Sequence, residues 1–187
     1  LITWKTPRDD GVFAEGTVVT AEVTVDRLES AVRRVRFYEA DPATGLLWVR
    51  QAPVAELTAP PFRLTLPRRA AQWVHLVAMA TDDRGVSSQS SVRFRYAPSN
   101  DAFERRQVLS SMNALPPSMI GGGSLEPGES FWDPIIGASL WWTWTAPGSG
   151  MARFRLEANG PFGSDWRLAA FRGNSVNSLV RLVESNW

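Results

Sequence analysis

Short runs in which apolar and polar residues alternate fill the first half of the chain. Alternation with a period of two is typical of a β-strand that buries one face. Clusters of Gly, Pro and Asp separate the runs, which therefore follow one another as strands joined by turns. None of these stretches holds a helical period. We expect strands over residues 18–25, 32–39, 46–49, 62–66, 74–80 and 87–96, a spacing that predicts a β-sandwich.

The most aromatic stretch of the chain reads SLWWTWTAPGSG and spans residues 139–150. In a strand, Leu140, Trp142 and Trp144 lie on one side. Trp141 lies on the other side, together with two threonines. The side with two tryptophans needs an opposing layer of structure. Trp141 either belongs to the core as well or forms part of an aromatic binding surface.

Three segments of the first half, in this order, carry a family resemblance. They read FYE at residues 37–39, APPF at 59–62 and AMATDDRG at 78–85. They resemble the bacterial Ig-like domains of large surface proteins. The resemblance covers about residues 1–97 and implies an Ig-like β-sandwich over that part of the chain.

Four ordered motifs follow in the second half. They are NDAF from residue 100, EPGE from residue 126, the aromatic stretch, and the segment 164–173. Over about residues 100–187 they resemble the bacterial pre-peptidase C-terminal (PPC-like) domain. Trp166 and the Phe171-Arg172 pair depart from the residues usual in that family. The resemblance implies a second sandwich of the PPC-like or jelly-roll-like kind.

Together the two resemblances predict an all-β chain of two β-sandwich domains in tandem. The first spans residues 1–97 and the second 102–187, with residues 98–101 as a short linker. PPC-like domains usually continue for a few strands beyond the segment that ends here at Trp187. Truncation, a shortened variant of the fold, or strands supplied by a neighbouring subunit would each explain this ending. A sandwich that lacks strands exposes unpaired backbone, which favours pairing with another chain.

The composition limits the classes of function. The 187 residues include no Cys, which excludes disulfides, thiolate metal sites and a cysteine nucleophile. All but one of the 20 basic residues are Arg; they alternate with apolar residues along predicted strands and are offset by 19 acidic residues. This pattern indicates a solvated sheet face and argues against a nucleic-acid partner. No apolar run is long enough to cross a membrane, and the first residues do not read as a signal peptide.

Few residues of the sequence are candidates for a catalytic role. A Ser-His-Asp triad needs a base that activates the serine, and His75 is the only histidine. Alternation places His75 on the outward face beside Val77, so we interpret it as a surface residue. Glu126 and Glu129 could act as a pair of carboxylates as in glycosidases, but loop chemistry explains them equally well. We therefore predict that the chain is not an enzyme.

Oxygen-bearing side chains in the loops support one metal hypothesis. Calcium prefers carboxylate, amide and backbone oxygens. The PPC-like resemblance implies that these loops come together, because related collagen-binding domains of bacterial collagenases bind calcium near their N-terminal segment. Ordinary turn and cap roles are the alternative, since no DxDxDG loop is present. The candidate calcium ligands are Asn100, Asp101, Glu126, Glu129 and Asp165.

Two functions follow from these resemblances. The first is a non-catalytic structural or adhesive module of a large exported bacterial surface protein or filament. It would act through domain packing and through contacts of strand edges or aromatic residues with other domains or with copies of itself. The second is an accessory domain of a secreted hydrolase that binds polysaccharide or protein substrate. Trp132, Trp141 and Trp166 would then be stacking residues. Both functions place the chain outside the cell or on the cell surface, without membrane insertion.

Overall fold

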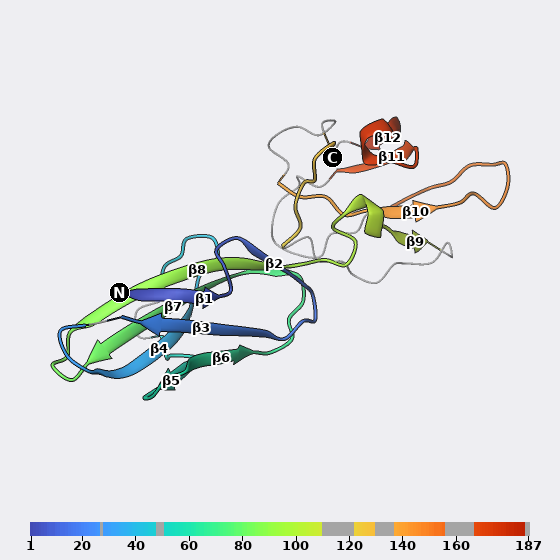
Figure 1. Cartoon of the computed structure of the whole chain (residues 1–187). Helices are drawn as coiled ribbons and strands as arrows, with labels where there is room; N and C mark the ends of the chain where they lie inside the picture. Colours follow the sequence, from blue (N-terminus) through green and yellow to red (C-terminus); the bar gives the residue numbers. More distant parts are fainter. Residues whose placement is uncertain (27, 48–50, 110–121, 130–136, 156–166, 186–187) are drawn as a thin grey trace.

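The chain folds into β-strands in both halves, as a computed structural model shows (Figure 1). The structure describes residues 1–26, 28–47, 51–109, 122–129, 137–155 and 167–185. Within these ranges it contains twelve strands, β1 to β12, and two short 3-10 turns, η1 (Phe103–Arg105) and η2 (Val176–Ser178). The prediction of an all-β chain is confirmed. In this described part, no helix has the length and apolar character needed to span a lipid bilayer.

Two packed sheets form a sandwich in the first half. One sheet has the order β1-β3-β6 and the other the order β2-β8-β7-β4-β5. The strands of the first sheet are β1 (Ile2–Thr6), β3 (Val19–Val25) and β6 (Phe62–Leu66). Those of the second are β2 (Gly11–Ala14), β8 (Ser87–Ala97), β7 (Gln72–Asp82), β4 (Val32–Ala40) and β5 (Ala55–Leu57). The predicted first sandwich is therefore confirmed as a two-sheet fold.

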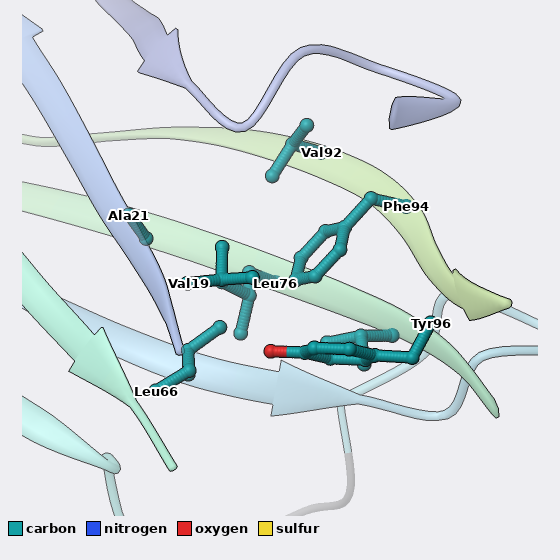
Figure 2. Close-up of a cluster of buried hydrophobic side chains, with 8 residues drawn as sticks. Val19, Ala21, Leu66, Leu76, Val92, Phe94 and Tyr96 are labelled. Atoms are coloured by element: carbon teal, nitrogen blue, oxygen red, sulfur yellow. The ribbon is translucent and has the colours of Figure 1, made fainter. Parts of the chain in front are cut away.

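Alternation along β7 shows why these residues form a sandwich. Val74, Leu76 and Ala78 point inward and are fully buried, while His75 and Met79 lie on the outer face and are half-buried. Facing strands supply the rest of the core, which forms two clusters, and Figure 2 shows the first of them between the sheets. The first cluster contains Val19, Ala21, Leu66, Val74, Leu76, Val92, Phe94 and Tyr96. The second contains Ile2, Val23, Val35, Phe37, Phe62, Ala78 and Ala80.

One predicted strand lies elsewhere. We expected residues 46–49 to pair with the preceding strand, but Leu46 and Leu47 are outside any strand and residues 48–50 lie outside the described part. The antiparallel partner of β4 on this side is instead β5, with Leu57 opposite Val35. The Asp, Pro and Gly residues after β4 form a turn. The Asp41 carboxylate accepts hydrogen bonds from the backbone N of Ala43 and Thr44, and the Asp41 backbone N donates to the Leu46 carbonyl oxygen at 3.1 Å.

The N-terminal segment contributes a strand to each sheet. β1 pairs antiparallel with β3, and after Pro7 the chain crosses over so that β2 pairs parallel with β8. The edge of β8 is thereby covered by β2. The other edge strand of this sheet, β5, has only three residues, and short edge strands limit unwanted pairing with other chains.

The second half contains two small sheets within the described residues. β9 (Gln107–Leu109) and β10 (Trp142–Trp144) run parallel, whereas β11 (Leu168–Arg172) and β12 (Val180–Ser185) form an antiparallel ribbon. An isolated antiparallel bridge joins Ser124 to Ser139. The assignment of this half to a PPC-like sandwich stays a prediction.

Candidate functional site

The junction between the two halves holds two buried polar side chains of the described residues, Asn100 and Asp101. β8 ends at Ala97, and Pro98, Asn100 and Asp101, from the segment expected to be a linker, are all buried. Asp101 is only 5% exposed, although aspartate is usually a surface residue. These side chains must therefore find their hydrogen-bond partners inside the protein.

Asp101 is the centre of this network. Its Oδ1 accepts a hydrogen bond from the Ser124 backbone N at 2.6 Å, and its Oδ2 accepts one from the Ser124 hydroxyl at 3.0 Å. Arg95, near the end of β8, donates from Nη1 to Asp101 Oδ2 at 3.2 Å and from Nη2 to Ser124 Oγ at 3.0 Å. Arg95 Nη1 also donates to the carbonyl oxygen of Gly122. A buried ion pair thus joins the last strand of the sandwich to the second half.

Asn100 and Trp141 form a second connection. The Asn100 side-chain amide donates to the Trp141 carbonyl oxygen at 3.1 Å, and the Trp141 backbone N donates to the Asn100 carbonyl oxygen at 2.9 Å. The Trp141 ring packs edge-on against Phe103, with ring centroids 5.1 Å apart, and lies 6.0 Å from Phe171. Trp141 therefore packs with Phe103 in the interior of the described part of the second half.

This position corrects the interpretation of the aromatic stretch. Trp141 is only 7% exposed, so it does not present an open face to a sugar or peptide, and the proposal of Trp141 as a stacking residue is wrong for this structure. Trp142 and Trp144, expected on the more buried side, are half-buried. Trp141 is the more buried because Phe103, which is distant in the sequence, packs on its ring. The other candidate stacking residues, Trp132 and Trp166, lie outside the described residues.

Glu129 and Glu126 have separate structural partners. Glu129 Oε1 accepts hydrogen bonds from the Ser139 hydroxyl at 2.9 Å and from Trp141 Nε1 at 3.1 Å. Its Oε2 is buried and has no hydrogen-bond partner among the described residues. Glu126 Oε1 accepts a hydrogen bond from the Phe103 backbone N at 2.5 Å, at the start of η1. Glu126 thus binds a backbone N at the start of η1, whereas Glu129 binds two side chains of the aromatic stretch.

Three of the candidate calcium ligands already accept hydrogen bonds from groups of the protein. Both carboxylate oxygens of Asp101 and one oxygen each of Glu126 and Glu129 accept hydrogen bonds from the protein. Asp165 lies outside the described residues. Within the ranges that the structure describes, no three acidic or histidine side chains come together as metal ligands. Calcium binding stays a prediction that involves a residue outside those ranges.

His75 lies on the outer face of the five-stranded sheet, as predicted from alternation. Its ring packs against the loop after β4, where a Cβ atom added at Gly45 would lie 2.7 Å from His75 Cε1. Val74 and Leu76, its neighbours in β7, point into the core. The loop covers one side of the ring, which is the arrangement of a packed surface residue.

Burial raises the pKa of Glu129 above its usual range, and the nearby Glu126 carboxylate acts in the same direction. A carboxyl with a raised pKa in the folded state stabilises the fold most below its unfolded pKa. That stabilisation is lost as the pH rises toward the folded value. We therefore expect Glu129→Gln to gain stability relative to the wild type as the pH rises from acidic to neutral.

Urea unfolding between pH 4 and pH 8 measures this difference. The two curves of unfolding free energy against pH should diverge as the pH rises, because only the wild type must ionise a buried carboxyl. Glu104→Gln, at an exposed position in η1, serves as the matched control and should run parallel to the wild type. If the curve for Glu129→Gln ran parallel to that of the wild type, the raised pKa of Glu129 would be contradicted.

Comparison with known proteins gives distant likenesses. No family model and no curated protein matches the chain. Among solved structures, one of fibronectin(III)-like modules of Clostridium thermocellum CbhA is 18% identical, with a TM-score of 0.43 over 51% of this chain. The chain spans less than half of that structure, 45% of its length. CopC from Methylosinus trichosporium OB3b is 15% identical, with a TM-score of 0.30 over 50% of this chain and 88% of CopC.

Proposed function

We propose that the chain is a non-catalytic structural or adhesive module of a large exported surface protein or filament. It acts by holding two β-rich units in a fixed orientation and by offering strand edges to other domains. The observation that supports this function is the buried Arg95–Asp101 pair, whose side chains are 11% and 6% exposed.

A buried ion pair at this position favours one arrangement of the two halves. Removing two charges from water is unfavourable unless good geometry and further hydrogen bonds compensate for it. The contacts of Asp101 with Ser124 and Arg95 meet that condition only when β8 and the second half are docked. Away from this pair, Glu15 accepts a hydrogen bond from the Ser99 backbone N at 2.9 Å, which holds the connecting segment against the sandwich. A flexible linker would instead leave such a segment exposed and polar.

Residual dipolar couplings of the whole chain in solution test the proposed function. We expect the amides of the sandwich and of the second half to fit a single alignment tensor. Asp101→Ala should separate the couplings into two tensors, and Asp101→Asn gives the same test with a residue of similar size. Glu22→Ala, which removes the acidic partner of two exposed cations, is the control and should keep one tensor. Two independent tensors in the wild type would rule out a module of fixed orientation.

A further inference from the structure

The ribbon formed by β11 and β12 has an open side. Within the described part of the chain β12 pairs with β11 alone, so its second edge has no strand partner among the described residues. Figure 1 shows where the ribbon lies in the second half. The face of β11 that carries Phe171 packs on Trp141. A two-stranded ribbon is only marginally stable by itself in water and gains from a further strand.

A β-bulge in β12 determines which of its side chains lie on each face of the ribbon. Ala170 pairs with Val183 and Phe171 pairs with Arg181, so Leu182 is the extra residue of the bulge. Val183 therefore shares the face opposite Phe171 with Val180, which pairs with Arg172. Both valines are exposed, at 62% and 52%.

The same bulge brings Arg181 and Glu184 to the other face of the strand. Residues three apart in a regular strand point to opposite faces, but here Arg181 Nη1 lies 2.5 Å from Glu184 Oε2. Arg167 Nη1 lies 3.6 Å from the other oxygen of Glu184, so two guanidinium groups share one carboxylate. Two arginines beside this face therefore share one acidic side chain, which leaves one positive charge unbalanced.

We propose that the free edge of β12 binds an extended segment of another protein in which apolar and acidic residues alternate. An added strand places its side chains beside those of β12, directly opposite on each face. Its apolar residues lie next to Val180 and Val183, and its carboxylates lie next to Arg181. Backbone hydrogen bonds to the open edge supply affinity, and the two faces supply specificity. The inference rests on the proposed function, because it names the partner that a strand edge of the module contacts.

Peptide binding to the whole chain tests the inference. The probe is a capped, fluorescently labelled peptide of alternating valine and glutamate, and its matched control has lysine in place of glutamate. We expect the glutamate peptide to bind at least about tenfold more tightly, as a difference in Kd from fluorescence anisotropy. A glutamate peptide with N-methylated backbone amides should lose binding, because it cannot complete the ladder.

Reversing the charge of Arg181 tests the preference for acidic residues most directly. Arg181→Glu should reverse the preference, so that the lysine peptide binds more tightly than the glutamate peptide. Arg63→Glu is the matched control, since Arg63 also lies on an edge strand, is similarly exposed and pairs with a glutamate. It should leave the preference of the wild type unchanged.

Three results would overturn the inference: no binding of the glutamate peptide, equal binding of the two peptides, or a preference that Arg181→Glu leaves unchanged. Self-association of the chain that Val183→Asp abolishes and the peptide does not compete for would also overturn it, in favour of a second copy as the occupant. Loss of peptide binding with a single alignment tensor leaves the proposed module function standing. Two tensors with intact peptide binding overturn the fixed orientation alone.

Discussion

Replacing Asp101 with alanine is expected to lower the free energy of unfolding by about 3–5 kcal/mol, the loss typical of breaking a buried ion pair on one side. The variant leaves the Arg95 guanidinium buried without its carboxylate and removes the acceptor of the Ser124 backbone N. Both groups keep their desolvation cost in the folded state and lose the interaction that offset it. Urea unfolding followed by tryptophan fluorescence measures the change.

A double-mutant cycle separates the ion pair from the other contacts of Asp101. Arg95→Ala alone should also destabilise the chain strongly, whereas the double variant Arg95→Ala, Asp101→Ala should lose much less than the sum of the two. Glu22→Ala is the surface control: its ion pairs with Lys5 and Arg63 involve exposed cations, so we expect a loss of less than about 1 kcal/mol. A loss of similar size for Asp101→Ala would show that the junction is not held by the buried pair.

Gly122→Ala is expected to have the second largest effect. Gly122 has a φ of +89°, and an alanine Cβ would lie 2.3 Å from the Tyr96 carbonyl oxygen and 2.8 Å from the Gln72 backbone N. The unfavourable backbone conformation alone costs about 1–3 kcal/mol. The contact adds to this cost, because backbone atoms of the sandwich cannot rotate away as a side chain can. Thermal unfolding should show a lower midpoint.

Two control glycines separate the causes. Gly16 has a similar φ of +75° but nothing within 4 Å of an added Cβ, so Gly16→Ala measures the backbone term alone. Gly148 has neither a positive φ nor a close neighbour, and Gly148→Ala should have little effect. If Gly122→Ala destabilises no more than Gly16→Ala, the close approach of the second half to the sandwich is not maintained in solution.

Five strands of the sandwich, β3, β4, β6, β7 and β8, could be predicted from the sequence because each of them buries one face. The shorter strands β1, β2 and β5 were not predicted. In β7 every second residue, from Val74 to Ala80, is apolar and buried, so the period-two pattern directly reports the architecture. The turn after β7 was equally predictable, because Asp82 binds the backbone N of Arg84 and Val86 as Asp commonly does in turns.

The junction could not be predicted in this way. Arg95 alternates with apolar residues along β8, so it reads as one more solvated arginine. Its burial depends on Ser124 and Gly122, which lie more than two dozen residues later and approach it only in the folded chain. From the sequence, Asp101 is interpreted as a turn or cap residue, because its contacts with the distant Ser124 cannot be seen there. Local pattern reports which face of a strand is apolar, but it does not report which distant segment covers the polar face.

The N-terminal segment crosses from one sheet to the other, and this crossing has a mechanical consequence. β2 and β8 are parallel, with four residue pairs from Gly11 opposite Phe94 to Ala14 opposite Ala97. When tension reaches β2 from its N-terminal end and β8 from its C-terminal end, the two strands are drawn past each other along their length. Their hydrogen bonds are then loaded together in shear and do not open one at a time from one end. Tension applied in this way therefore has to break the backbone hydrogen bonds between β2 and β8 together.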